Sequence, residues 1–184
     1  MVGDFIILNN KEANILSRAI KFFTRSKFTH TAIGMGKVLG EEATLGAELL
    51  ISVLPLKRWT EDSEVEVIIY RPVKIPSKIK REIVKEMYEH FVGTEYGYFQ
   101  LLWFIWRWIA EGLGFDVRKR GNWFPEGTIC SELNFYYLER LAKYYNDNDL
   151  TVRLQEWNGN NFTPRDAYTV INEFKGTLFK EVKG

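Results

Sequence analysis

The chain has 184 residues, 46% hydrophobic and 27% charged, which is typical of one folded domain with a sizeable core. Lysine and arginine total 25 against 24 acidic residues, so no basic excess favours nucleic acid as a partner. One cysteine excludes an intrachain disulfide, and the start of the chain lacks the basic and apolar regions of a signal peptide. These features predict a cytoplasmic protein.

The first part of the chain predicts mainly strands. Apolar runs and alternating polarity indicate strands in four segments: 4–9, 28–36, 40–56 (two short strands bent at Gly46) and 64–72. Between the first two segments, apolar residues at helical spacing predict a helix at 11–25.

The second part predicts mainly helices. They are expected at 77–92 (capped by Ser77), 97–111, 129–145 and 163–174 (capped by Thr163, with Pro164 at the first helical position). Residues 112–127 read as a loop and 176–182 as a last strand. Early strands followed by later helices favour an α+β fold over a doubly wound one. We expect one domain, 1–184, with a helical and aromatic insertion at about 97–127.

The segment 99–115, FQLLWFIWRWIAEGLGF, is rich in tryptophan. Its unbroken apolar run, 101–106, is far shorter than the roughly 18 residues that span a bilayer. A buried or half-buried helix is the ordinary interpretation. The alternative is a peripheral membrane contact or an acyl-chain-binding surface, because tryptophans beside an arginine suit a membrane boundary.

The only cysteine, Cys130, lies in PEGTICSEL, where the fourth helix begins. It starts an apolar stripe at helical spacing that continues with Leu133, Asn134, Tyr137, Leu138 and Leu141, which is typical of a buried structural thiol. Its place in the first turn favours a second interpretation. Unpaired backbone N–H groups and the positive end of the helix dipole stabilise a thiolate there and can bind an oxyanion.

A cysteine nucleophile needs a base, and the chain has two histidines. His90 falls in the last turn of the 77–92 helix, where a solvated histidine is ordinary. His30 lies in the extended FTHTAIGMG, on the same face as Phe28, Ala32 and small glycines that leave room for another element. A core histidine is the other interpretation of His30. Glu41 or Glu42 on the next strand would orient the imidazole, and alternation allows only one of them to do so.

Five short motifs follow one another along the chain: Gly3-Asp4, Thr29-His30, Glu42-Ala43, Gly93-Thr94-Glu95-Tyr96 and Cys130-Ser131-Glu132. In this order they resemble the circularly permuted NlpC-like papain-fold hydrolases. This group includes lecithin:retinol acyltransferase relatives and bacterial and viral proteins. The similarity covers nearly the whole chain.

The resemblance implies Cys130 as nucleophile, His30 as general base and Glu42 as the orienting acid. Tyr96 takes the position of an aromatic residue near the active site, where it contacts substrate or simply packs. The fold implied is papain-like, with a small antiparallel sheet or half-barrel packed on the helix that starts at Cys130. No metal or organic cofactor is implied.

We therefore expect a thiol hydrolase or acyl-transfer enzyme that acts through a covalent thioester. Its substrate would be a peptide, a peptidoglycan-like amide or a lipid acyl ester. The basic loop residues Arg118, Lys119 and Arg120 would favour an anionic group or be simply solvated. The alternative is a catalytically inactive papain-like binding module, associated with lipid through segment 99–115.

Overall fold

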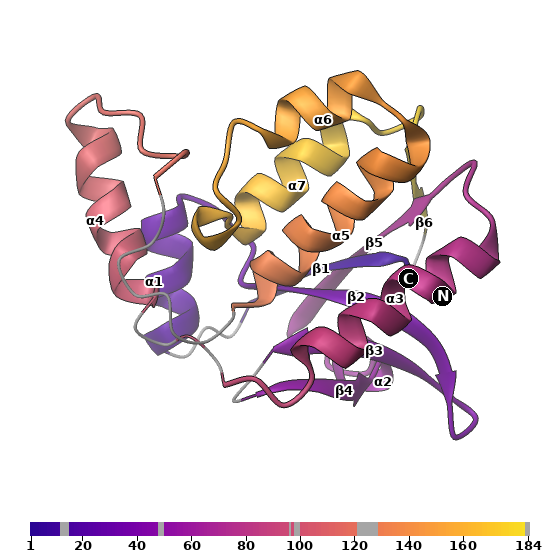
Figure 1. Cartoon of the computed structure of the whole chain (residues 1–184). Helices are drawn as coiled ribbons and strands as arrows, with labels where there is room; N and C mark the ends of the chain where they lie inside the picture. Colours follow the sequence, from indigo (N-terminus) through magenta and orange to yellow (C-terminus); the bar gives the residue numbers. More distant parts are fainter. Residues whose placement is uncertain (12–14, 48–49, 96, 98–99, 121–128, 183–184) are drawn as a thin grey trace.

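The computed structural model describes all residues except 12–14, 48–49, 96, 98–99, 121–128 and 183–184. The described chain is an α+β fold in which a six-stranded antiparallel sheet carries helices on both faces (Figure 1). The predicted α+β class is confirmed.

The strands pair in the order β4-β3-β2-β1-β5-β6, so the first strand of the chain is central. Their bounds are β1 (Phe5–Asn10), β2 (His30–Val38), β3 (Glu41–Ala47), β4 (Ile51–Pro55), β5 (Val65–Pro72) and β6 (Phe179–Val182). A two-residue turn, Leu39-Gly40, joins β2 to β3. Both turn residues have positive φ, 50° and 88°, as the twist of a tight hairpin requires.

Helix α5 packs against β2 and is surrounded by α3, α6 and α7 (Figure 1). The helices are α1 (Ile15–Thr24), α2 (Lys57–Thr60), α3 (Ser77–Phe91), α4 (Gln100–Gly112), α5 (Cys130–Tyr145), α6 (Asn148–Leu154), α7 (Pro164–Glu173) and the 3-10 helix η1 (Gly159–Asn161). Short α2 belongs to the other face of the sheet, where Trp59 packs against residues of β1 and β2.

Strand alternation divides the core into two parts. Phe5 and Ile7 of β1 belong to the large cluster with α5, whereas Ile6 and Leu8 belong to the small cluster with Trp59. Because paired residues of neighbouring strands share a face, this parity extends to β2 and β3. It therefore fixes which strand residues can meet α5.

Gly3 and Asp4, directly before β1, fix the position where this strand begins. Gly3 has φ 72°, and a Cβ there would lie 2.1 Å from the Tyr137 hydroxyl oxygen, so only glycine fits. The Asp4 side chain is fully buried and accepts hydrogen bonds from the Arg71 guanidinium at 2.7 and 3.0 Å. The Gly-Asp motif thus places the start of the central strand.

Most predicted elements are confirmed, and three details differ. The break after β3 falls beyond Ala47, because Gly46 lies within β3 and pairs with Ala32 and Ser52. Ser77 begins α3 and makes no capping hydrogen bond, since Pro76 occupies the N-cap. The helix expected from residue 11 is described as α1 from Ile15, with residues 12–14 outside the described chain.

Other boundaries agree, and three short elements are new. Thr163 caps α7 and Pro164 is its first residue, as predicted, and Asp166 completes a capping box with Thr163. The helix expected at 97–111 is described as α4, and residues 113–120 of the expected loop form no helix or strand. Elements α2, α6 and η1 were not predicted.

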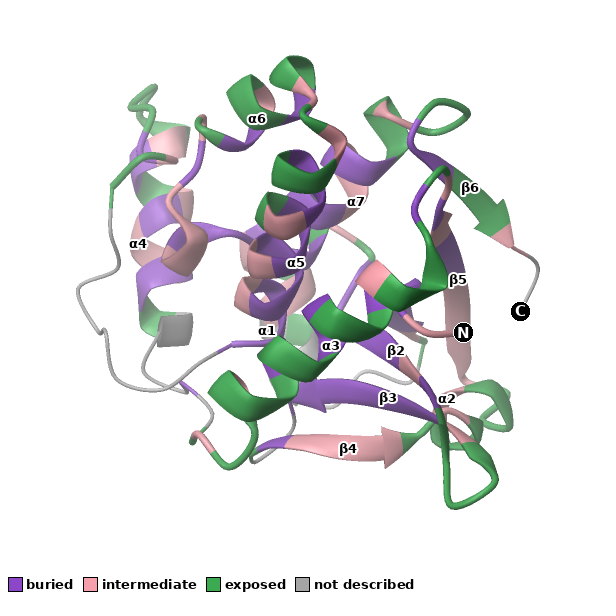
Figure 2. Ribbon diagram, turned by 45° about the vertical axis from the view of Figure 1, so that its right-hand side comes forward, coloured by how far each residue is buried: buried purple, intermediate pink, exposed green. Residues whose placement is uncertain are grey.

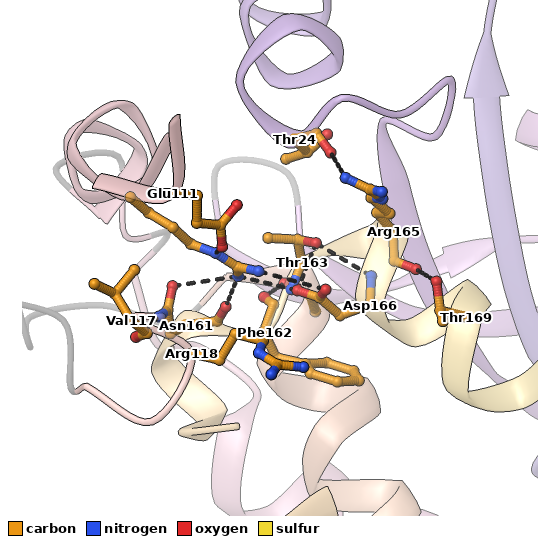
Figure 3. Close-up of polar contacts among 12 residues, drawn as sticks. Thr24, Glu111, Val117, Arg118, Asn161, Phe162, Thr163, Arg165, Asp166 and Thr169 are labelled. Carbon is orange, nitrogen blue, oxygen red and sulfur yellow. Dashed lines mark hydrogen bonds and ion pairs between the residues drawn. The ribbon is translucent and has the colours of Figure 1, made fainter. Parts of the chain in front are cut away.

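Helix α4 lies at the periphery of the molecule, beside α1 (Figure 1). Arg107 connects it to the body, because its guanidinium donates to the Asn161 carbonyl at 2.5 Å and the Asp166 carboxylate at 3.0 Å. Figure 3 labels these two acceptor residues, Asn161 and Asp166, together with Glu111. Burial lowers the pKa of Arg107, but Asp166 and Glu111 outweigh that effect and raise it overall. In the described chain, no helix has the length and apolarity needed to cross a membrane.

Candidate active site at the start of helix α5

Cys130 is the first residue of α5 and is only 3% exposed. The predicted stripe is confirmed, since Leu133, Tyr137, Leu138 and Leu141 are all fully buried. Figure 2 colours much of α5 as buried. Ile129 precedes the helix in an extended conformation, φ −99° and ψ 158°. The thiol therefore lies where an extended segment turns into a helix.

The surroundings of the thiol combine burial with hydrogen-bond donors. Burial raises the pKa of Cys130, and hydrogen bonding from Thr31 and from the backbone at Cys130 and Ser131 opposes that rise. The net result is a neutral thiol at physiological pH. The donors are those that would stabilise negative charge on the sulfur or on an oxygen bound beside it.

Neighbouring side chains hold the start of α5 in place. The Ser131 hydroxyl donates to the Phe162 carbonyl at 2.5 Å, which fixes α5 to the segment before α7. The Asn134 amide donates to the Cys130 carbonyl at 3.1 Å. Cys130 consequently sits on a well-anchored first turn.

Glu132 caps the same turn. One of its carboxylate oxygens accepts from the backbone N–H of Ile129 at 2.8 Å, which is the acidic half of a capping box. Burial raises the pKa of Glu132 to about 7, with the Ile129 hydrogen bond opposing the rise. A carboxyl group that titrates near neutrality thus lies two residues from Cys130.

His30 lies on the opposite face of the sheet from Cys130. Its ring centroid is 5.4 Å from that of Trp59, and its Nε2 atom is 3.4 Å from where a Cβ on Gly46 would be. Thr31, the next residue, points to α5 and interacts with the thiol. The structure therefore brings β2 to Cys130 but presents Thr31, not His30, on that face.

The two acidic candidates separate as alternation predicts. Glu42 shares the parity of Thr44 and Gly46, hence the face of His30, whereas Glu41 pairs with Lys57. However, Glu42 is paired with Lys37, which lies seven residues beyond His30 along β2. Glu42 and His30 are therefore roughly 20 Å apart. A Glu42 carboxylate oxygen instead lies 3.9 Å from the amino group of Met1. The structure does not bring Glu42 to His30.

The remaining candidates do not add to the site. Tyr96 lies outside the described residues. His90 is exposed near the end of α3 and stacks on Tyr136 with ring centroids 6.0 Å apart. Among the described residues, no three His, Cys, Asp or Glu side chains gather in a way that would hold a metal ion.

Sequence reasoning missed Thr31 and Trp59, and it misjudged Phe28. Phe28 was expected on the face of His30, but it belongs to the α5 side, where its ring lies 4.5 Å from that of Tyr168. Alternation alone could have separated Thr31 from His30. The face that each would take depends on what packs above the sheet, and the sequence does not show that.

Comparison with known proteins adds a likeness of fold. No family model and no curated protein matches the chain. The crystal structure of the metalloprotein yiiX from Escherichia coli O157:H7 is similar in fold, with a TM-score of 0.52 and 18% sequence identity. The similarity spans 100% of this chain and 96% of that one. At this identity the likeness concerns the arrangement of the elements.

Proposed function

We propose that this chain is a cysteine hydrolase or acyltransferase with Cys130 as its nucleophile. One observation carries the proposal: the single thiol is the buried first residue of α5, and Thr31 and the backbone at Cys130 and Ser131 oppose the rise in its pKa that burial causes. Donors at a helix start favour a thiolate and an oxyanion. The ordered sequence motifs support the same function.

In the proposed reaction, a base removes the Cys130 proton and the thiolate attacks the carbonyl carbon of an ester or amide. The tetrahedral oxyanion is held by the N–H groups at the start of α5. The leaving alcohol or amine takes the proton from the base, and a thioester forms. Water or another acceptor then releases the acyl group and regenerates the thiol.

His30 is the proposed base, and this role requires a local rearrangement. His30 is the first residue of β2 and is adjacent in the chain to Thr31, which already contacts the thiol. Turning over the end of the strand would exchange the faces of the two side chains. We propose that substrate entry accompanies this change, since burial keeps the thiol neutral without it.

The second candidate is a binding module of the same fold without turnover. It is favoured by the specific finding that His30 and Cys130 occupy opposite faces of the sheet while burial raises the pKa of the thiol. In that case Cys130 serves as a small buried side chain.

Acylation of the intact protein, followed by mass spectrometry, separates the two candidates. The protein is mixed with activated acyl esters and with peptide thioesters, and the mass of the adduct is recorded over time. The enzyme proposal expects one acyl group on wild-type protein and none on Cys130→Ala. It expects a rate at least about 100-fold lower for His30→Ala, because a general base contributes that much.

His90→Ala is the matched control, since it removes the other histidine from an exposed position. Its acylation rate should equal that of the wild type. If all variants that retain Cys130 acylate equally slowly, the thiol is merely buried and the binding-module candidate stands. If the wild type acylates rapidly and His30→Ala acylates at the same rate, Cys130 remains the nucleophile and another base must act.

A further inference from the structure

Helix α4 exposes a row of large apolar side chains. Leu102, Ile109 and Leu113 are 51%, 49% and 71% exposed, and their spacing of seven and four residues places them along one side of the helix. Phe115, just beyond the helix, is 63% exposed. The apolar side of α4 that faces away from Arg107 is therefore uncovered.

The apolar surface continues onto α1. Phe22 is 60% exposed, and its ring lies 5.3 Å from that of Trp108 on α4. Phe23 also contacts Trp108, with ring centroids 6.0 Å apart. The two helices lie side by side at one end of the molecule (Figure 1), and the contact between Phe22 and Trp108 joins the apolar residues of α1 to those of α4.

Cations border this surface. Arg18 and Arg25 are exposed. Arg18 lies four residues before Phe22, on the same side of α1, and Arg25 directly follows the helix. The Arg25 guanidinium lies 6.0 Å from the Trp108 ring and 3.9 Å from where a Cβ on Gly112 would be. The basic border thus reaches the end of α4.

Two acidic residues in the described part of α4 and the loop after it are already paired. Glu111 is bound to Arg107 at 2.7 Å, and Asp116 to Arg118 at 2.8 Å. Lys119 and Arg120, which follow in the chain, are exposed. The surface is consequently apolar at its centre and positive at its edge, although the whole chain carries a formal net charge of only +1.

We propose that this α1–α4 surface docks on an anionic lipid membrane. The surface comprises Arg18, Phe22, Arg25, Leu102, Ile109, Leu113 and Phe115. Apolar side chains enter the boundary between headgroups and acyl chains, while arginines bind lipid phosphates and other headgroup anions. A second copy of the chain would also cover the apolar centre, but it would bring two positive borders together. Charge complementarity therefore favours lipid. This proposal does not depend on whether Cys130 is catalytic.

Vesicle flotation tests the proposal with the full chain. Vesicles of pure phosphatidylcholine are compared with vesicles that also contain phosphatidylserine. Wild-type protein should float with the phosphatidylserine vesicles and much less with the neutral ones, and added salt should weaken binding. Emission from Trp108 and its neighbours should shift to the blue on binding.

Two pairs of variants separate the apolar and basic contributions. Ile109→Ser/Leu113→Ser should lose at least about tenfold in vesicle affinity, while Val152→Ser, which removes a 61% exposed apolar residue from α6, should behave as wild type. Arg18→Gln/Arg25→Gln should lose about fivefold per arginine. Its control, Lys78→Gln/Lys85→Gln, removes two exposed charges from α3 and should have little effect.

Several outcomes would overturn the proposal. Failure of the wild type to float with either kind of vesicle is one, and equal losses in the test and control variants are another. A third outcome is a wild-type protein that does not float but is a dimer by light scattering. If Ile109→Ser/Leu113→Ser abolishes that dimer, the surface serves self-association. All substituted positions are exposed, so unchanged thermal unfolding should confirm that each variant is folded.

Discussion

Helices α5 and α4 are both amphipathic and rich in aromatic residues, yet the fold buries them to different extents. Helix α5 is covered by the sheet and by three other helices, and its apolar stripe is fully buried. Helix α4 has the larger fraction of apolar residues but leaves one side in solvent. Burial therefore depends on what the topology places over a helix as much as on its own composition.

The largest expected effect concerns what holds α4 to the body. Arg107→Ala leaves the Asp166 carboxylate buried without its cation, and breaking a buried ion pair in this way costs about 3–5 kcal/mol of unfolding free energy. Chemical denaturation measures this loss, with Arg81→Ala on exposed α3 as the control. An equally small loss in both variants would mean that α4 is held by its ring contacts instead.

The same substitution in α5 and just beyond the end of α4 compares the two regions directly. Leu138→Ala in α5 removes a fully buried side chain and should lower the free energy of unfolding by about 3 kcal/mol. Leu113→Ala beyond α4 removes a 71% exposed one and should change it by less than about 0.5 kcal/mol. A large loss for Leu113→Ala would show that this side is covered in solution.

The smallest expected effect concerns the acids of the two helices. Glu111 on α4 faces Arg107, whereas Glu132 on α5 is half-buried, and burial raises its pKa to about 7. Between its ordinary pKa and about 7 the folded state binds more protons, so the stability that Glu132 contributes falls as pH rises through this window. Glu132→Gln should flatten that dependence and be more stable above neutrality by about 2 kcal/mol.

Urea denaturation at acidic and mildly alkaline pH checks this prediction, with Glu139→Gln as the control at an exposed position of α5. If the free energy of unfolding depends on pH in the same way for wild type and Glu132→Gln, the Glu132 carboxyl group is solvated.

Local patterns predict the elements well, because the alternation in β5 and the N-cap at Thr163 depend on near neighbours. The burial of the Cys130 stripe could also be predicted. The opposite orientations of His30 and Cys130 could not, since they depend on the pairing of β2 with β1 and on which face α5 covers. The contact between Thr31 and Cys130 spans about half the chain, beyond the reach of any local signal.

The central place of β1 has a consequence for synthesis. Strands β1 to β4 can pair as soon as the ribosome has released them, because each neighbours the next in the chain. The apolar face of these strands stays uncovered until α5 is synthesised, and the last residue of α5, Tyr145, emerges long after Pro55. A growing chain of this protein thus carries an uncovered sheet for much of translation, and such a sheet invites aggregation or chaperone binding.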